Sequence, residues 1–194
     1  MLHPALKAFL QGKITLTAQQ ESIAGSFFLF RSIKKNEILL PKGKVATHIF
    51  FVISGCLRIY LSDDESLNEF TRFLIFEGSF GTAFPSFILQ QPSVAAIQSL
   101  ETSEVLMLGY EDRKRLYAEI PGWESMDRKG LELDYIASIL RIESLISMDA
   151  ATRYQMLLKR NPKMVLRLPS RIIADYLGIS TETLSRLKSK SRNY

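Results

Sequence analysis

Hydrophobic and polar positions divide the chain into a helical beginning, a strand-rich middle and a helical end. Residues 1–26 have helical spacing, and Thr17 followed three positions later by Gln20 matches a capping box. From Phe27 to Leu108, short runs rich in Phe, Ile, Val and Leu alternate with clusters of Gly, Pro, Ser and Asp. Many short strands at regular spacing predict an all-β sandwich or barrel. The predicted strands are residues 27–30, 37–40, 49–54, 56–61, 68–76, 94–100 and 104–108.

Helical spacing returns after Tyr110. Residues 111–120 predict a short helix that Pro121 and Gly122 end. Residues 123–148 would form a helix roughly 35 to 40 Å long at 1.5 Å per residue. We expect it to cover one side of the sandwich and to offer a seam to a second copy of the chain; packing wholly against its own domain is the alternative. Its apolar residues follow nearly a three-four repeat: Met126, Leu133, Ile136, Ala137, Leu140 and Leu145.

The last part of the chain has the pattern of a helix-turn-helix. A helix over residues 149–161 is expected to end near Pro162, and residues 169–188 have the spacing of two helices around a turn. Gly178 can adopt the left-handed conformation that ends the first of these helices, and Ser180 can cap the second. The residues expected to face inward are Ile173, Ala174, Leu177, Ile179, Leu184 and Leu187.

The free face of the second helix carries side chains that can read DNA. Arg186 can donate two hydrogen bonds to guanine, and Glu182 can accept one from cytosine. Such a face lies in the major groove when a helix-turn-helix binds DNA, with flanking cations and hydroxyls on phosphates. The alternative is a helical hairpin with a solvated charged face. The candidate DNA-binding residues are Ser170, Arg171, Ser180, Thr181, Glu182, Ser185, Arg186, Lys188 and Lys190.

Charge supports a polyanionic partner for this end of the chain. The 194 residues carry a net charge of +5. From Thr152 to Tyr194 there are ten Lys and Arg residues against two acids, a net +8, which leaves −3 on the preceding residues. A basic segment on a mildly acidic body suggests contact with nucleic acid. A solvated basic tail is the alternative.

The composition argues against an enzyme and against a resident cofactor. The only cysteine is Cys56, and the two histidines, His3 and His48, are far apart in sequence. These residues make neither an iron–sulfur cluster nor a metal site, so we expect no catalytic residues, metal or cofactor. A cupin-like enzyme on the same sandwich would need several His and Glu ligands. No membrane-length apolar run or signal peptide is evident, so we expect a cytoplasmic protein without membrane contact.

These motifs together resemble the Crp/Fnr superfamily of bacterial transcription regulators, especially its Bacteroidetes-type members. Residues 48–61 resemble the strand–turn–strand of their cyclic-nucleotide-binding sandwich, and residues 149–162 and 168–188 resemble their linker helix and helix-turn-helix. Phe80 and Gly81 resemble the opening of their phosphate-binding cassette. The resemblance implies a homodimer joined along the long helix that binds a near-palindromic double-stranded operator. It also implies a small-molecule effector of unknown identity and RNA polymerase as a candidate partner.

The resemblance implies a ligand pocket, but the chain departs from the family pattern there. The implied pocket residues are Phe80, Gly81, Thr82, Ala83, Ser93 and Val94. Cyclic-nucleotide-binding members have a glutamate where Thr82 stands, and no Arg or Lys occurs between Gly78 and Gly109 to pair with a phosphate. We therefore predict that cyclic AMP is not bound with useful affinity. Four apolar residues could instead favour an apolar ligand or simply fill the core: Phe84, Phe87, Ile88 and Leu89.

We expect an α+β protein: an N-terminal antiparallel β-sandwich or jelly roll of cyclic-nucleotide-binding type, a long dimerisation helix and an all-α helix-turn-helix domain. The expected boundaries are 1–122 for the effector-type sandwich with flanking helices, 123–148 for the dimerisation helix and 149–194 for the DNA-binding domain. Few residues follow Lys188, so the β-hairpin wing of family members is expected to be missing or minimal. The expected function is a transcription regulator; a ligand-binding sensor with weak or lost DNA binding is the alternative.

Overall fold

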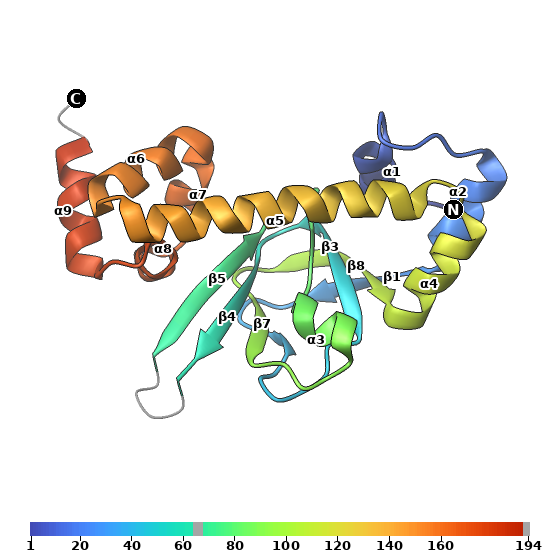
Figure 1. Cartoon of the computed structure of the whole chain (residues 1–194), viewed down its shortest axis with the longest axis horizontal. Coiled ribbons are helices and arrows are strands. Elements are labelled where there is room, and N and C mark those ends of the chain that lie inside the picture. Colours follow the sequence, from blue (N-terminus) through green and yellow to red (C-terminus); the bar gives the residue numbers. More distant parts are fainter. Residues whose placement is uncertain (64–67, 192–194) are drawn as a thin grey trace. The chain divides into compact units, whose positions relative to one another are not determined.

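A computed structural model of the chain describes residues 1–63 and 68–191. The chain divides into two compact units (Figure 1). Unit 1 comprises Met1–Asn68 and Arg72–Gly130, and unit 2 comprises Glu69–Thr71 and Leu131–Tyr194.

Unit 1 is a sandwich of two four-stranded sheets, with strand orders β1-β8-β3-β6 and β2-β7-β4-β5. The strand pairings, such as Phe28 opposite Leu108 and Ile59 opposite Ile97, are antiparallel. The strands are β1 (Phe28–Ile33), β2 (Ile38–Leu40), β3 (His48–Ser54), β4 (Leu57–Ser62), β5 (Glu69–Ile75), β6 (Phe80–Gly81), β7 (Ala95–Ser99) and β8 (Ser103–Gly109). Its helices are α1 (Pro4–Leu10), α2 (Ala18–Ser26), α3 (Phe84–Leu89) and α4 (Tyr110–Glu119). The predicted antiparallel sandwich is confirmed.

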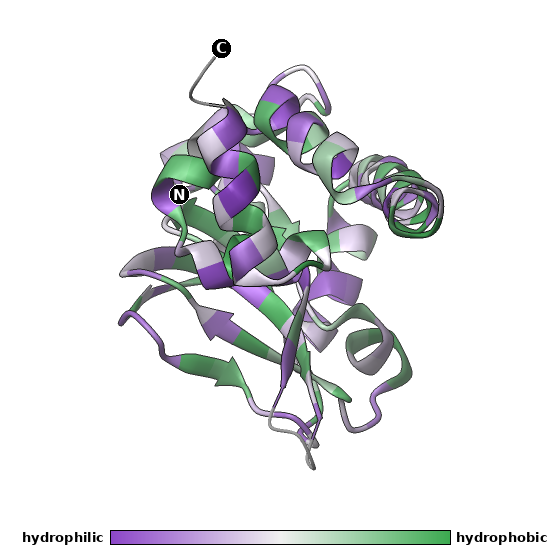
Figure 2. Cartoon of the chain, turned by 90° about the vertical axis from the view of Figure 1, so that its left-hand side faces the viewer, coloured by the Kyte–Doolittle hydropathy of each residue, from purple (hydrophilic) through white to green (hydrophobic). Residues whose placement is uncertain are grey.

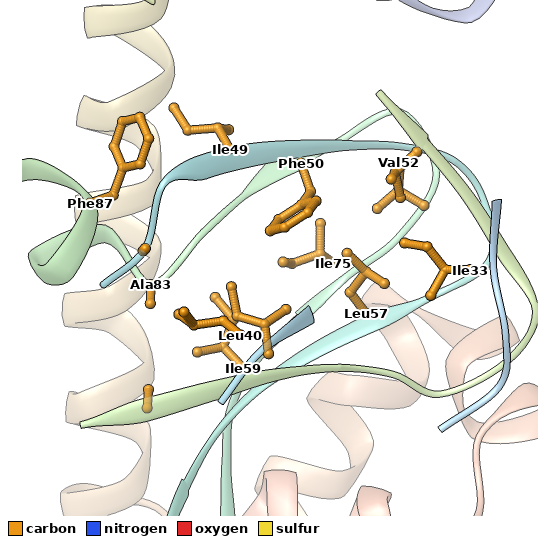
Figure 3. Packing of buried hydrophobic residues seen from close by; sticks show 14 residues of the cluster. Ile33, Leu40, Ile49, Phe50, Val52, Leu57, Ile59, Ile75, Ala83 and Phe87 are labelled. Atoms are coloured by element: carbon orange, nitrogen blue, oxygen red, sulfur yellow. The ribbon is translucent and has the colours of Figure 1, made fainter. Parts of the chain in front are cut away.

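Strand β3 is buried on both faces because it lies between two hydrophobic clusters. Phe50 and Val52 face the core between the sheets, while Phe51 faces a second cluster formed with the flanking helices. Successive side chains of a strand point to opposite faces, so a continuous apolar run suits this position. Burying each such side chain stabilises the fold by about 1.5–3 kcal/mol. Figure 3 shows the packing of the first cluster.

The flanking helices form as their sequence signals predict. Thr17 and Gln20 make the full capping box: the Gln20 N–H donates to Thr17 Oγ1 at 3.2 Å, and the Thr17 N–H donates to Gln20 Oε1 at 2.9 Å. Leu6 of α1 and Leu116 of α4 are fully buried in the second cluster, next to Trp123. These helices therefore close the outer face of the sheet that contains β3.

The turn between β3 and β4 depends on Gly55. This residue has φ +99°, and a Cβ added to it would lie 2.0 Å from Ser103 Oγ. Its N–H donates to Glu77 Oε1 at 2.9 Å. A side chain at this position would be strained by the backbone angle and blocked by a buried serine.

Unit 2 is helical. Helix α5 (Trp123–Ser147) begins in unit 1 and continues into unit 2, followed by α6 (Ala150–Arg160), α7 (Pro162–Arg167), α8 (Ser170–Leu177) and α9 (Thr181–Ser191). Hydrophobic and hydrophilic residues are interspersed along these helices (Figure 2). The residues that pack their interior include Tyr154, Leu157, Met164, Leu168, Ile173 and Leu184.

Two short helices were not predicted. Helix α3 has a proline at its start and ends at Gln90, which is left-handed with φ +51°. Helix α7 also starts with a proline, Pro162, whereas the sequence pattern indicates only the end of the preceding helix there. A proline both stops one helix and suits the first turn of the next, so it marks the boundary without revealing whether another helix begins there.

Within residues 1–63 and 68–191, no helix combines the length and apolar character needed to span a bilayer. The same residues contain no cluster of three or more His, Cys, Asp or Glu side chains able to hold a metal ion.

Candidate nucleic-acid interface and effector pocket

The turn between α8 and α9 is built on a Schellman motif. Gly178 is left-handed at φ +64°, ψ 42°. The Ile179 N–H donates to the Ala174 carbonyl at 3.0 Å, and the Gly178 N–H donates to the Asp175 carbonyl at 3.0 Å. These two bonds satisfy carbonyls that the end of α8 would otherwise leave unpaired. The glycine predicted to make the turn does so.

The start of α9 is capped as the sequence suggests. Ser180 Oγ accepts a hydrogen bond from the Thr183 N–H at 3.1 Å. Glu182 lies in the first turn, where its own backbone N–H, followed by the hydroxyls of Ser180 and Thr181, lowers the pKa of its carboxyl. The carboxylate therefore stays ionised beside the positive end of the helix dipole.

The inner face of this helix pair is buried. Ile173, Ala174, Leu177 and Leu184 are 0%, 2%, 4% and 1% exposed, as their spacing predicts. Ile172, which was not among the expected inward residues, is also buried at 7%. This packing fixes which face of α9 is left outside.

The outer face of α9 is polar and accessible. Thr181, Glu182, Ser185, Arg186 and Lys190 are all exposed. Exposure of this set is the condition that a recognition helix must meet, because base edges are read by side chains that are free of the protein core.

Hydroxyls and cations flank this face. Lys188 Nζ donates to Ser170 Oγ at 2.8 Å, which connects α9 to the first residue of α8. Ser170 and Arg171 are exposed. The structure thus brings Ser170, Arg171 and Lys188 to the α8 side of α9. Residues 192–194, part of the segment expected to lack a wing, lie outside the described residues.

Some cations of the basic segment have structural partners instead. Arg153 Nε donates to the Leu177 carbonyl at 3.0 Å, and its guanidinium also donates to the Met148 carbonyl. Arg153 therefore stabilises the C-terminal ends of two helices. The net charge of the segment overstates the charge available to a polyanion by at least this residue.

Helix α5 exposes a wide apolar surface. Tyr135, Ile139, Ile142 and Ile146 are 68%, 37%, 52% and 81% exposed. Their spacing of four, three and four residues is the heptad pattern of a coiled-coil seam. These four residues were not among those expected from the sequence to form the repeat. Four large residues that were expected, Leu133, Ile136, Leu140 and Leu145, are also exposed and lie on the same helix.

A small cavity of about 130 Å³ lies beside α3 in unit 1; we call it the α3 cavity. Of the six pocket residues that the family resemblance implied, Ala83, Ser93 and Val94 line it. Its full lining is Arg72, Ala83, Pro85, Ser86, Leu89, Gln91, Pro92, Ser93, Val94 and Ala95.

The other three implied residues serve the fold. Phe80 packs its ring 4.9 Å from that of Phe51. A Cβ on Gly81 would lie 2.1 Å from Ile75 Cδ1, so a side chain there would displace the core. Thr82 Oγ1 donates to the His48 carbonyl at 2.8 Å, which ties the segment after β6 to β3. None of the three lines the α3 cavity.

Arg72 was not predicted as a cavity residue. The family pattern places the phosphate-binding cation between Gly78 and Gly109, where the sequence has no Arg or Lys, whereas β5 brings Arg72 to the cavity from an earlier part of the chain. The apolar residues near α3 also divide: Phe87 is fully buried, but Phe84 and Leu89 are 38% and 63% exposed. The core-filling alternative therefore holds for Phe87 alone among these three.

A second cavity, of about 160 Å³, opens between β2 and β3 and includes Lys44 and His48 in its lining. Burial is the largest effect on His48 and lowers the pKa of its imidazole; Asp112 opposes this and Arg31 adds to it. His48 Nδ1 lies 2.8 Å from Thr47 Oγ1. The histidine is thus held by its neighbours, with no metal-binding cluster around it among the described residues.

Helix α3, beside the α3 cavity, is connected to the start of α5 through side-chain contacts. Phe87 of α3 packs edge-on to Tyr110, with ring centroids 5.4 Å apart. Arg113 lies 6.0 Å from the Phe87 ring and forms an ion pair with Asp127 of α5 at 2.8 Å. Tyr117 also donates to Asp127, and burial, followed by this hydrogen bond, raises the pKa of the tyrosine. Side-chain contacts therefore run from α3 through α4 into α5.

Comparison with known proteins fits this architecture. Residues 30–119 match the cyclic nucleotide-binding domain family. No curated protein matches the full sequence significantly.

Solved structures extend the likeness to the rest of the chain, which has the Crp/Fnr fold. CLP of Xanthomonas campestris, named a c-di-GMP responsive global regulator, has a TM-score of 0.71 at 17% identity, covering 91% of this chain and 92% of its own. A CooA mutant from Carboxydothermus hydrogenoformans has a TM-score of 0.72 at 20% identity, covering 100% and 87%. A protein from Eubacterium rectale, described as a Crp/Fnr-family transcriptional regulator, has a TM-score of 0.68 at 18% identity, covering 95% and 84%.

Proposed function

We propose that this protein is a homodimeric, DNA-binding transcription regulator of the Crp/Fnr type. The observation that carries the proposal is the helix-turn-helix of α8 and α9, with its outer face of Thr181, Glu182, Ser185 and Arg186 exposed. Arg186 can read guanine and Glu182 can read cytosine in the major groove. The regulators with the same fold, such as CLP, support a role in gene expression.

The dimer is proposed to form along α5. Its exposed stripe of Tyr135, Ile139, Ile142 and Ile146 is too apolar to remain in water as a plain surface helix. Pairing two such stripes buries them as a coiled-coil seam. Two recognition helices held in this way would enter major grooves about 34 Å apart, so the operator would be near-palindromic.

Cyclic AMP is not proposed as the effector. Thr82 stands where cyclic-nucleotide-binding family members have the glutamate that binds the ribose. Its hydroxyl donates a hydrogen bond to the His48 carbonyl. Pro92 and Ser93 line the cavity in the region where family members supply a phosphate-binding arginine. The cavity, about 130 Å³, is also below the roughly 300–1,000 Å³ of typical small-molecule sites.

Selection of bound duplexes from a random DNA pool tests the proposal. The expected result is enrichment of one sequence with two related half-sites in inverted orientation. A parallel titration with cyclic AMP is expected to show no binding at micromolar concentration. Failure to enrich any sequence would favour the alternative, a ligand-binding sensor with weak or lost DNA binding. Micromolar cyclic AMP affinity would overturn the ligand part alone.

A further inference from the structure

The hydroxyl groups around the α3 cavity are already engaged. Ser86 Oγ donates to the Gln91 carbonyl at 2.5 Å and accepts from the Ala46 N–H at 2.9 Å. Ser93 Oγ donates to the Ala95 carbonyl at 2.7 Å and accepts from the Ala95 N–H at 3.1 Å. A ligand would therefore gain little from either serine.

Arg72 is the cation of this cavity. Its guanidinium lies 5.4 Å from the centroid of the Phe73 ring but has neither a hydrogen bond nor an ion pair within the part of the chain that the structure describes, and no Asp or Glu lines the cavity. Gln91 adds a neutral amide, while Pro85, Leu89 and Val94 are apolar. A positive group beside an apolar surface favours an anion that also has an apolar body.

Size and polarity favour a carboxylate within this class. A guanidinium satisfies both oxygens of a carboxylate through two parallel hydrogen bonds. A nucleotide would bring a sugar and a base whose polar atoms the remaining lining does not pair, and burying unpaired polar groups is costly. The small volume of about 130 Å³ further favours a compact ligand.

We propose that the α3 cavity binds a small organic carboxylate, with Arg72 as its anchor and Leu89 and Val94 in contact with its apolar part. The α3 cavity would be the effector site of the proposed regulator. A regulatory effect of the carboxylate rests on that proposed function, whereas binding of the carboxylate does not. Binding itself is measured without DNA, so failure of one proposal is distinguishable from failure of the other.

Benzoate and hexanoate serve as probes, with inorganic phosphate and cyclic AMP as comparison anions, in titration calorimetry of the full chain. The wild type is expected to bind at least one carboxylate at millimolar concentration or below. Arg72→Gln should weaken that binding on the order of tenfold or more, because the charge-assisted pair is lost. Arg72→Lys should retain part of it, since lysine keeps the charge but not the bidentate geometry.

Lys35→Gln is the matched control, because Lys35 is exposed and lines neither cavity. It removes one positive charge and should leave carboxylate affinity unchanged. The proposal fails if neither carboxylate binds to the wild type, if Arg72→Gln binds as the wild type does, or if Lys35→Gln weakens binding equally. Tighter binding of cyclic AMP or phosphate than of both carboxylates would overturn the ligand class.

Discussion

At the scale of single residues, the proposed DNA-binding segment contains cationic side chains with different partners: some are exposed, and others are hydrogen-bonded within the protein. Arg186 is exposed on the outer face of α9, whereas Lys188 is shared with Ser170 and Arg153 holds helix ends. Cationic residues of the same basic segment therefore differ in how available they are to bind DNA. We expect base readout from Arg186, whose guanidinium can donate two parallel hydrogen bonds, and sequence-independent attraction to phosphates from the exposed lysines.

Arg186→Ala should weaken binding to the selected operator by about 1–3 kcal/mol and relax base preference at one position. Lys190→Ala is the companion variant. It should weaken all DNA sequences alike and reduce the slope of log affinity against log salt by about one. Binding isotherms at several salt concentrations separate the two effects. An Arg186→Ala protein as selective as the wild type would show that the recognition register is wrong.

The roles of single residues could be predicted from the sequence only where they follow a local pattern. The inward residues of α8 and α9 follow from spacing because both helices contribute a single buried stripe. Arg72 and the pairing of Arg113 with Asp127 do not, since these residues are brought together by long-range packing that leaves no periodic signal. For the same reason, the sequence could not show that the Phe80 ring packs in an aromatic cluster with Phe9 and Phe51.

At the scale of elements, two features define the helical half: the sharp turn at Gly178 and the apolar stripe of α5. The turn requires a left-handed backbone, and a Cβ there would lie 3.2 Å from Leu145 Cδ2. The sequence revealed the turn because glycine, cap and leucine spacing agree locally. The sequence indicated the exposed apolar residues of α5 only in part, because both flanks of the stripe are apolar and apolar spacing alone does not say which residues are exposed.

Gly178→Ala should destabilise the protein by about 1–2 kcal/mol, because an L-residue is strained in the left-handed conformation. Gly130→Ala is a matched control in α5, where an added Cβ meets nothing within 4 Å. That change should stabilise by roughly 0.5–1 kcal/mol, as alanine favours a helix interior. Urea unfolding measures both. Equal effects of the two substitutions would contradict the account of the turn.

Ile142→Glu should shift the chain from dimer to monomer, because a pair of seam positions would then bury like charges. Lys129→Glu places the same residue at an exposed position of α5 before the stripe and should leave the dimer intact. Sedimentation analysis at several concentrations reports the change. Unchanged association of Ile142→Glu would place the dimer contact elsewhere.

At the scale of the whole molecule, the chain combines an antiparallel sandwich that matches the cyclic nucleotide-binding domain family, a long helix with an exposed apolar stripe, and a pair of helices joined by the turn at Gly178. The antiparallel sandwich was predictable because its strands are short, apolar and separated by turns. Control of DNA binding would require a ligand that favours one arrangement of the recognition helices over another. The contacts from Phe87 through Arg113 to Asp127 offer a physical connection between helix α3 and α5.

The central claim is that two copies present their recognition helices to one face of a duplex. The most direct measurement is affinity for the selected operator as base pairs are inserted between its half-sites. Inserting about five base pairs, half a helical turn, should abolish the gain from the second half-site by rotating it to the opposite face of the duplex. Affinity that does not change with this insertion would contradict the claim.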